Sequence, residues 1–225
     1  MITNVPIITI DGPSSSGKGT ISKLVAEKLG WHFLDSGAVY RTFALVIIKN
    51  NIQLNDIPAL VVAASALNAE FIDQPGSPQK IILETEDVTN AIRHEECGVM
   101  ASKTAAIAEV RAALTPFLRS FCRLPGLVAD GRDMGTVVFP NARFKIFLTA
   151  SAEERARRRF LQLQGSGINA TLDAVLQGLM ERDIRDESRV VAPLKPDSAA
   201  VIIDTTKLSV DEVLQLILAH AKTRF

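Results

Sequence analysis

The amino-acid sequence predicts a three-layer α/β fold, in which helices cover a five-stranded parallel sheet. Two observations support this class. Short runs rich in β-branched residues recur along the chain, and segments with helical spacing of apolar residues lie between them. A glycine-rich loop directly follows the first of these runs, as expected where a buried strand ends and a helix begins.

The first elements are a strand, a helix and a second strand. Residues 7–11 form a β-branched run that ends at Gly12. Apolar residues at helical spacing follow the loop, and Gly30 stands where a C-terminal cap belongs. Residues 32–34 then form a second short run. This order predicts a βαβ unit and therefore parallel pairing.

Three later apolar runs complete the sheet, at residues 127–130, 144–148 and 200–204. Each of the last two runs is followed by a serine with a glutamate three positions later, in Ser151-x-x-Glu154 and Ser209-x-x-Glu212. Both patterns predict a capping box, in which the hydroxyl and the carboxylate bond the otherwise unpaired amides at a helix start.

The segment between the second and third strands is too long for a simple crossover and predicts an insertion. Residues 69–73 and 80–84 form two strand-like runs, joined by a turn-rich loop at 74–79. We expect helices to follow around 87–92 and 97–121. Because proline lacks a backbone N–H, Pro116 is expected to kink or break the second helix.

The charge balance excludes several classes of protein. The 225 residues contain 25 Lys plus Arg and 25 Asp plus Glu, so the chain lacks the basic excess of a protein that tracks along nucleic acid. Its longest apolar stretch, at 58–67, is too short to span a bilayer. We therefore expect no transmembrane helix and neither a nucleic-acid nor a membrane partner.

The N-terminal residues and the cysteines favour a cytoplasmic protein. Residues 1–6 show no basic region followed by an apolar run and a cleavage site. Cys97 and Cys122 have no CxxC pattern and no neighbouring histidine pair, so we expect two buried free thiols and no metal bound by the protein.

The glycine-rich loop contains the pattern G-x-x-x-x-G-K and predicts a phosphate site. Glycines let backbone amides converge on an anion, the helix start adds partial positive charge, and the lysine reaches the β- and γ-phosphates of a nucleotide. The candidate nucleotide-binding residues are Gly12, Pro13, Ser14, Ser15, Ser16, Gly17, Lys18, Gly19 and Thr20.

One position departs from many such loops. Gly19 stands where a Ser or Thr often ligates magnesium, and the hydroxyl comes one residue later at Thr20. The Gly-Lys-Gly-Thr sequence resembles the loop of the nucleoside monophosphate kinases. That resemblance implies that Mg²⁺ is held largely through waters and phosphate oxygens, whereas regulatory GTPases more often carry Gly-Lys-Ser/Thr.

Arginines in short polar motifs are candidates for a second phosphate site, because the planar guanidinium suits phosphate oxygens. Two such motifs, at 35–41 and 130–135, follow the second and third strands at the carboxyl edge of the sheet, where ligands bind in open α/β folds. Arg182, Asp186 and Arg189 share one helical face, which is also compatible with a solvated ion-pair ladder.

A basic run after the fourth strand is a candidate lid. It contains Arg155, Arg157, Arg158 and Arg159 and leads to Gly165-Ser166-Gly167. A basic helix that ends in a glycine hinge suits a lid over a nucleotide. The same pattern is equally compatible with a plain exposed helix face.

Four segments together resemble bacterial-type cytidylate kinases, and the match runs from about residue 5 to the C-terminus. They are IDGPS at 10–14, LDSGAVYR at 34–41, ADGRDMGTVVFP at 129–140, and the R-D repeats at 182–186 with VAPL at 191–194. The resemblance implies a P-loop NTPase fold with strand order 2-3-1-4-5 and transfer of the ATP γ-phosphate to CMP or dCMP. It also implies one domain over 1–225, with a core at 1–58 and 125–225, a nucleotide-binding insertion at 59–124 and a lid near 155–170.

The same resemblance implies roles for individual residues. Ser102, Arg111 and Asp133 would contact the cytosine, and Asp186 the ribose hydroxyls. The acceptor phosphate would lie against Arg41, Arg132, Arg182 and Arg189, with Ser36 beside it. The catalytic set would be Lys18, Arg132, Arg158, Arg182 and Arg189, with ATP and Mg²⁺ as cofactors and a monomer as the working form.

Donor and acceptor matching supports the cytosine assignment. A carboxylate accepts a hydrogen bond from the exocyclic amine of cytosine, whereas uracil carries a carbonyl there. The alternatives within the enzymes are kinases of UMP, AMP or shikimate, against which Asp133 and the insertion argue. A switch GTPase or a nucleotide-gated binding module is a further alternative, but the sequence has no N-K-x-D motif.

Overall fold

The computed structural model describes residues 5–74, 76–165 and 167–225. The chain folds as two compact units. The core unit comprises Met1–His32 and Cys122–Phe225, and the insertion unit comprises Phe33–Phe121. Three parts of the sequence predictions lie outside the described residues: the N-terminal residues 1–4, Pro75 in the hairpin loop and Ser166 in the glycine hinge. The division of the domain into a core at 1–58 and 125–225 and an insertion at 59–124 stays a prediction.

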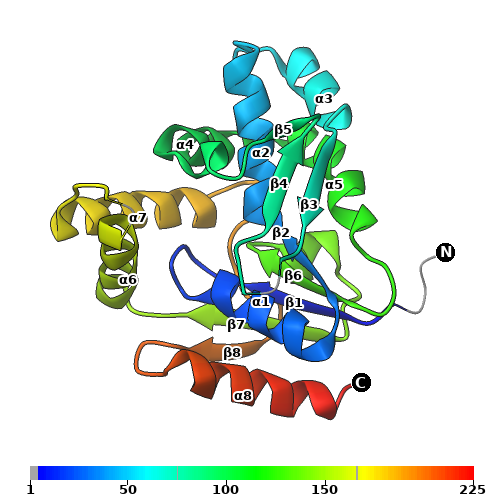
Figure 1. Ribbon diagram of the computed structural model, residues 1–225, viewed down its shortest axis with the longest axis vertical. Coiled ribbons are helices and arrows are strands. Elements are labelled where there is room, and N and C mark those ends of the chain that lie inside the picture. The colour runs from blue at the N-terminus through cyan, green and yellow to red at the C-terminus, as the bar shows by residue number, and fades with distance from the viewer. Residues whose placement is uncertain (1–4, 75, 166) are drawn as a thin grey trace. The chain divides into compact units, whose positions relative to one another are not determined.

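A five-stranded sheet carries the fold, with the order β2-β6-β1-β7-β8 (Figure 1). Its strands are β1 (Ile7–Asp11), β2 (His32–Asp35), β6 (Leu127–Gly131), β7 (Phe144–Thr149) and β8 (Val201–Asp204). When only the strands of this sheet are numbered along the chain, β6, β7 and β8 become strands 3, 4 and 5, and the order reads 2-3-1-4-5. The predicted α/β class, the five strands and their order are therefore confirmed.

The central strand β1 is buried and parallel to both neighbours. Ile7 is opposite Leu127 of β6, and Ile8 is opposite Phe144 of β7. The side chains of Ile8 and Ile10 are fully buried. A β-branched run suits this position, because a central parallel strand has both faces covered. The carboxyl end of β1 then delivers the glycine-rich loop.

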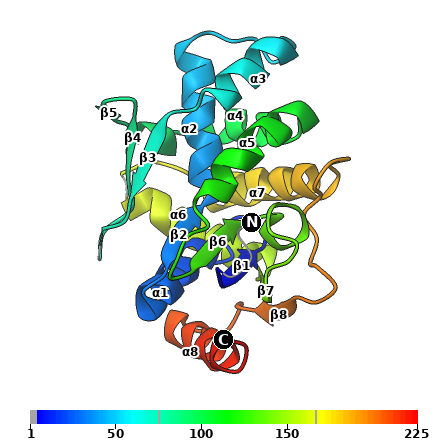
Figure 2. The same cartoon turned by 90° about the vertical axis from the view of Figure 1, so that its right-hand side faces the viewer.

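The described part of the core unit contains four α-helices: α1 (Lys18–Leu29), α6 (Ala152–Gly165), α7 (Leu172–Glu187) and α8 (Val210–Lys222). As predicted, α1 ends at Gly30, whose φ of 66° is left-handed and whose N–H bonds the carbonyls of Ala26 and Glu27. In both views, α1 lies beside α8 and α6 beside α7 (Figures 1 and 2).

The two predicted capping boxes have different outcomes. At α8 both bonds are present, because Ser209 accepts from the Glu212 N–H and Glu212 accepts from the Ser209 N–H. At α6 only the first half forms, from the Glu154 N–H to the Ser151 hydroxyl at 3.2 Å. The Ser151 N–H instead donates to Thr206 Oγ1 at 2.9 Å, which leaves the Glu154 carboxylate available for arginines.

The insertion unit combines helices with a small antiparallel sheet. Its elements are α2 (Ser36–Lys49), α3 (Ile57–Ser65), β3 (Ala69–Ile72), β4 (Lys80–Leu83), β5 (Glu86–Asp87), η1 (Ala91–Arg93), α4 (Glu95–Thr104) and α5 (Ala108–Ser120). The predicted hairpin is confirmed as β3 and β4, and β5 adds a third strand. The Phe71 ring packs edge-on against Phe117 and Phe121, at centroid distances of 6.1 and 5.5 Å, so β3 shares a core with α5.

The predicted helix at 87–92 is wrong. Asp87 belongs to β5, and only the short turn η1 follows. The Asp87 carboxylate accepts from the Thr89 N–H at 3.0 Å and from the Thr89 hydroxyl at 2.6 Å. Such a local bond from an aspartate side chain competes with helix formation, so the chain turns here.

The predicted single helix at 97–121 is also wrong, and the interruption does not lie at Pro116. The chain leaves the helical path between Thr104 and Ala108, and Pro116 lies inside the continuous helix α5. Leu114 and Leu118, on either side of the proline, are buried. Their packing holds the helix together although one backbone donor is missing. Across the described ranges, no helix is long and apolar enough to cross a membrane.

Candidate phosphate-transfer site

The glycine-rich loop between β1 and α1 depends on glycine at two positions. A Cβ on Gly12 would lie 2.1 Å from the Leu148 carbonyl oxygen of β7, so no side chain fits there. Gly17, which caps α1, has a φ of 90°. These two residues let the loop pass close to β7 and turn into the helix, as the G-x-x-x-x-G-K pattern predicts.

Lys18 is the first residue of α1, and its side chain folds back over the loop. Its Nζ donates to the Pro13 carbonyl at 3.0 Å, and the residue is only 8% exposed. The capping position is glycine, which has no side chain to bond the first amides of the helix. The loop therefore presents backbone N–H groups and a positive charge at one place, which is the arrangement that binds a phosphate.

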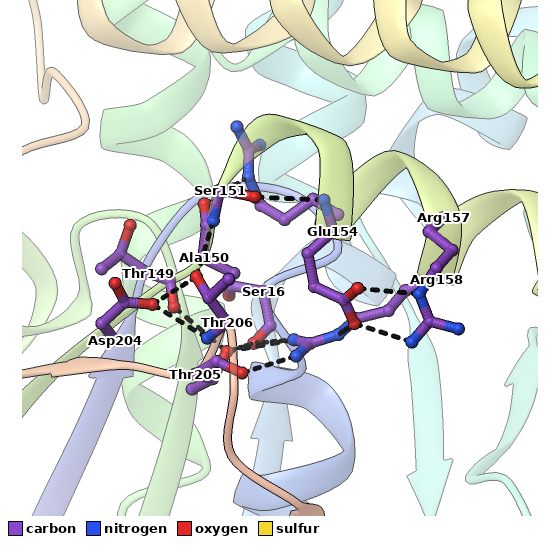
Figure 3. A network of polar contacts seen from close by, with 11 residues as sticks. Ser16, Thr149, Ala150, Ser151, Glu154, Arg157, Arg158, Asp204, Thr205 and Thr206 are labelled. Atoms are coloured by element: carbon purple, nitrogen blue, oxygen red, sulfur yellow. Dashed lines mark hydrogen bonds and ion pairs between the residues drawn. The ribbon is translucent and has the colours of Figure 1, made fainter.

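A polar network supports the loop from the side of β8 and α6 (Figure 3). The Ser16 carbonyl accepts from Arg158 Nη1 at 3.3 Å and from the Thr205 hydroxyl at 3.0 Å. Arg158 Nη2 also donates to the Thr205 carbonyl at 2.6 Å. Arg158, predicted as catalytic, thus contacts the backbone of the phosphate loop.

Glu154 holds two of the basic side chains of α6. Its carboxylate accepts from Arg157 Nε at 2.7 Å and from Arg158 Nε at 2.8 Å (Figure 3). The hydrogen bond from Arg157, with that from Arg158, lowers the pKa of Glu154 to about 2 although partial burial raises it. Glu154 therefore remains ionised at neutral pH and keeps Arg158 directed at Thr205.

Arg155 ties α6 to α7 and to the loop. It is buried, and its Nη1 pairs with Asp183 at 2.6 Å and donates to the Ser14 carbonyl at 3.3 Å. Its Nε donates to the Ala150 carbonyl at 3.1 Å. From the sequence, Arg155 was predicted only as part of a basic run, with no contact to α7 or to the loop. Asp183 was not predicted as a site residue.

Asp186 lies at the centre of an arginine cluster. Its carboxylate pairs with Arg132 at 3.0 Å and with Arg189 at 2.7 Å, and all three side chains are largely buried. Arg132 Nη2 also donates to the Ser14 hydroxyl at 2.8 Å. The structure thus brings together the phosphate loop, the end of β6 and the end of α7. The prediction that Arg189 shares a helical face with Arg182 and Asp186 is wrong, because α7 ends at Glu187 and Arg189 follows its capping residue Ser188.

Electrostatics keep Asp186 charged. Burial alone would raise the pKa of its carboxyl, but Arg132, Arg189 and Arg182 together lower it below the ordinary value. Two or three guanidinium groups around one carboxylate leave a net positive charge. That charge lies against the phosphate loop and can attract an anionic substrate.

Asp133 is buried and begins a wide turn, η2 (Met134–Val138), after β6. The following two amides, those of Met134 and Gly135, donate to the Asp11 carboxylate at 2.8 Å each. Burial raises the pKa of Asp11 to about 7, although these two backbone bonds oppose the rise. Asp11 was not among the residues singled out from the sequence.

Four predicted site residues belong to the insertion unit. Ser36 begins α2, where Asp35 caps the helix by accepting from the Ala38 N–H at 2.9 Å. Arg41, on the same helix, donates to the carbonyls of Ile92 and His94 at 3.1 and 3.3 Å.

Ser102 and Arg111 are buried on α4 and α5 of the same unit. Arg111 donates to the Ala105 carbonyl at 3.1 Å, and its guanidinium carbon lies 5.7 Å from the centre of the Tyr40 ring. This distance is within the range of a cation–π contact. Within this unit, Tyr40 of α2 and Arg111 of α5 are therefore brought together.

The roles of four residues that shape the site were missed from the sequence: those of Asp11, Arg155, Asp183 and Thr205. Thr205 follows β8 at the carboxyl edge of the sheet, so the rule that ligands bind at this edge could have indicated it. Asp183 lies in the same R-D repeats as Arg182 and Asp186. Asp11 lies in the IDGPS segment at 10–14, but its role left no signal there, because its partners are 123 and 124 positions away.

Comparisons with known proteins agree with this site. The profile of the family described as cytidylate kinase matches residues 8–223. A cytidylate kinase of Stutzerimonas stutzeri (strain A1501) is 55% identical over 225 residues, covering 100% of this chain and 98% of the relative. A cytidylate kinase of Shewanella loihica (strain ATCC BAA-1088 / PV-4) is 51% identical over 224 residues, covering 100% and 97%.

A solved structure supports the fold alone. The crystal structure of an uncharacterized protein from Eubacterium ventriosum ATCC 27560 aligns with a TM-score of 0.54 at 11% identity, covering 98% of this chain and 100% of that one. The family itself rests on the profile match over nearly the whole length and on relatives above 50% identity. The chain belongs to the cytidylate kinase family.

Proposed function

We propose that this chain transfers the γ-phosphate of ATP to CMP or dCMP through the residues described around its phosphate loop. One observation carries the proposal. The loop with the buried Lys18 is joined, through Ser14, to a cluster of arginines around Asp186. A donor site and an anion-binding cluster thus share one side chain within the core unit.

The donor triphosphate would occupy the loop formed by residues 12–20. Backbone amides at the start of α1 and the ammonium group of Lys18 would bind its β- and γ-phosphates. Ser16 and Gly17 keep their positions because Arg158 and Thr205 hold the Ser16 carbonyl. We therefore assign Arg158 to the catalytic set as a residue that holds the loop at the donor phosphates.

The residues present fit a Mg²⁺ ion that arrives with the nucleotide. Among the described residues, no group of three or more His, Cys, Asp or Glu side chains could hold a metal ion. Mg²⁺ commonly takes one or two carboxylates and fills its other positions with phosphate oxygens and water. Asp130 would supply such a carboxylate, because its Oδ2 lies 3.2 Å from where a Cβ on Gly19 would be. Mg²⁺ would neutralise phosphate charge there.

The acceptor phosphate would bind the arginines around Asp186. Arg132, Arg182 and Arg189 supply planar donors in a fixed arrangement, and we assign Arg41 of the insertion unit to the same phosphate. In phosphoryl transfer the protein contributes mainly positioning and charge neutralisation. No residue has to act as a strong general base.

The nucleoside would be read by polar side chains. We assign Asp133, Ser102 and Arg111 to the cytosine, Asp186 to the ribose hydroxyls and Ser36 to the acceptor nucleotide. Asp133 favours cytosine because a carboxylate can only accept hydrogen bonds, and the exocyclic amine donates one. We also propose that the enzyme is cytoplasmic and works as a monomer. Light scattering with and without CMP would test the oligomeric state.

A coupled assay of ADP release tests the activity. With ATP and Mg²⁺, we expect turnover with CMP and dCMP far above that with UMP, AMP or shikimate. Preference for any of the last three would refute the substrate assignment.

Lys18→Ala tests the donor site. Because Lys18 lies on the loop and its charge faces phosphate, the variant should stay folded and lose turnover by orders of magnitude. Lys23→Ala, on the same helix and ion-paired with Glu27, is the matched control and should retain turnover. Unchanged turnover of a folded Lys18→Ala variant would contradict the assignment.

Asp133→Asn tests the reading of the base. An amide can donate to the uracil carbonyl, so the ratio of kcat/KM for CMP over UMP should fall by about 5- to 150-fold, corresponding to a buried unpaired group of about 1–3 kcal/mol. A ratio within twofold of the parent, in a folded variant, would show that Asp133 does not read the base.

A further inference from the structure

We propose that Asp11 is a positioning residue for substrate selection: its carboxylate fixes the turn that carries Arg132 and Asp133 and thereby sets the preference for cytosine. This inference rests on the proposed function, in which Asp133 contacts the base. Asp11 belongs to neither the donor nor the acceptor residues named above. It acts through the backbone of another segment.

Asp11 contacts this turn through both oxygens of its carboxylate. Asp11 is the last residue of β1 and is 5% exposed. Its Oδ1 accepts from the Met134 N–H and its Oδ2 from the Gly135 N–H, both at 2.8 Å. Two bonds from two oxygens fix both the position and the direction of the peptide groups that follow Asp133.

The turn needs this support because its first amides have no partners within it. In η2 the Asp133 carbonyl accepts from the N–H groups of Val137 and Val138, at 2.9 and 3.2 Å. Those bonds satisfy the acceptor side of the turn. The first N–H groups of any helical turn lack such partners, and the Asp11 carboxylate supplies them.

Gly135 allows the close approach. A Cβ at this position would lie 2.7 Å from Thr9 Oγ1 and 3.3 Å from Asp11 Oδ2. Thr9 and Asp11 point from β1 to the same side, so the turn rests directly on the strand. A side chain at 135 would lift the turn off Asp11.

Two residues of proposed function depend on the position of this turn. Arg132 reaches Ser14 and Asp186 from one side of the turn, and Asp133 is its first, buried residue. Asp11 is also followed directly by Gly12 of the phosphate loop. The two possible roles of Asp11 predict different kinetic effects of its substitution. If Asp11 supports the turn, the kcat/KM values for CMP and UMP change; if it supports the phosphate loop, the KM for ATP changes.

Asp11→Asn separates these roles. The amide keeps the shape of the side chain but has one acceptor oxygen, and its NH2 group faces an N–H donor. At pH 8 we expect the ratio of kcat/KM for CMP over UMP to fall by about 5- to 20-fold, on the scale of one lost buried hydrogen bond. The KM for ATP should stay within twofold. An ATP KM that rises as much as that for CMP, or an unchanged ratio, overturns the inference.

Amide hydrogen exchange tests the contact itself without turnover. In Asp11→Asn, the amides of Met134 and Gly135 should exchange faster than in the parent. Asp56→Asn is the matched control, because the Asp56 carboxylate accepts the Ala59 N–H at the start of α3 and has no proposed substrate role. It should leave both amides and the selectivity unchanged. Equal protection of both amides in Asp11→Asn and the parent contradicts the inference.

A double-mutant cycle separates this inference from the proposed function. If Asp11 acts through Asp133, the variant with both Asp11→Asn and Asp133→Asn loses no more selectivity than Asp133→Asn alone. Additive losses overturn the inference but leave the role of Asp133 intact. If Asp133→Asn loses no selectivity, Asp133 does not recognise the base. The proposed effect of Asp11 on selectivity is then refuted as well.

Gly135→Ala is the second variant if Asp11→Asn does not fold. Its methyl group would meet Thr9 and Asp11 of β1 and push the turn away from the strand. We therefore expect the same loss of selectivity with an unchanged KM for ATP. A folded Gly135→Ala variant with parental selectivity contradicts the inference.

Discussion

Asp11 and Asp186 are both buried carboxylates beside the same phosphate loop, yet their pKa values move in opposite directions. Burial raises the pKa of Asp11 to about 7, and the bonds from the uncharged amides of Met134 and Gly135 oppose this rise without cancelling it. Burial also acts on Asp186, but Arg132, Arg189 and Arg182 outweigh it and lower the pKa. The charge of the partner, more than the depth of burial, decides the direction.

The two sites therefore have different electrostatic costs. The Asp186 region is a charge cluster in which each ion depends on the others. The Asp11 region is a backbone contact that a neutral side chain can partly replace. Substitution of each aspartate by asparagine compares the two directly.

The largest effect is expected from Asp186→Asn. It leaves Arg132 and Arg189 buried without their carboxylate, and removing one partner from a buried ion pair costs about 3–5 kcal/mol. Asp11→Asn should change the free energy of unfolding by about 1–2 kcal/mol at pH 8, on the scale of one lost buried hydrogen bond. Urea unfolding followed by fluorescence of the single tryptophan, Trp31, measures both. Equal losses in the two variants would break the comparison.

A second prediction concerns pH. Because the pKa of Asp11 in the folded chain is about 7 and its ordinary value is 3.8, the folded state binds the extra proton between these values. Asp11 therefore contributes stability at pH below 4 that is lost as pH rises through about 7, at up to about 1.4 kcal/mol per pH unit. The charges of Asp133 and Arg132 modify this pKa in opposite senses.

Unfolding measured from pH 5 to pH 8 checks this prediction. The parent should show a steeper fall in stability than Asp11→Asn, whose amide does not titrate. Asp186 has the opposite sign: its lowered pKa contributes stability above pH 3.8, and that stability is lost as acid protonates the folded state. Parallel pH profiles of the parent and Asp11→Asn would show that Asp11 does not titrate in this range.

The smallest effect is expected from Glu154→Gln, which extends the comparison to a carboxylate near the surface. Glu154 also has arginine partners, but Arg157 is 58% exposed on its side chain, so water screens the pair. We expect a loss below about 1 kcal/mol. Arg158 keeps its bonds to Thr205 and Ser16, so the KM for ATP should stay within twofold. A loss as large as that of Asp186→Asn would show that exposure does not separate the two clusters.

The sheet could be predicted from the sequence because its strands are local patterns. The β-branched run that ends at Gly12 and the short run that ends at Asp35 each carry their own boundary, and the strand order came with the family resemblance. The two-residue strand β5 has no such pattern and exists only because β4 pairs with it. The turn at Asp87 depends on a side-chain bond to Thr89 that helical spacing does not reveal.

The site could be predicted only where a residue carries its chemistry in a motif. The phosphate loop and the R-D repeats with Arg182 and Asp186 were visible in this way. The roles of Asp11 and Thr205 were not visible, because each is defined by a partner far along the chain, at 123 and 189 positions. A hydrogen bond between two distant segments produces no repeating pattern of residues in the sequence of either segment.

The contact of Thr205 with Ser16 also orders events during synthesis of the chain. The phosphate loop leaves the ribosome early, but Thr205 follows after 189 further positions. Until β8 has joined β7, the Ser16 carbonyl has neither Thr205 nor an Arg158 anchored at Thr205. A nascent chain therefore carries the complete motif without its support.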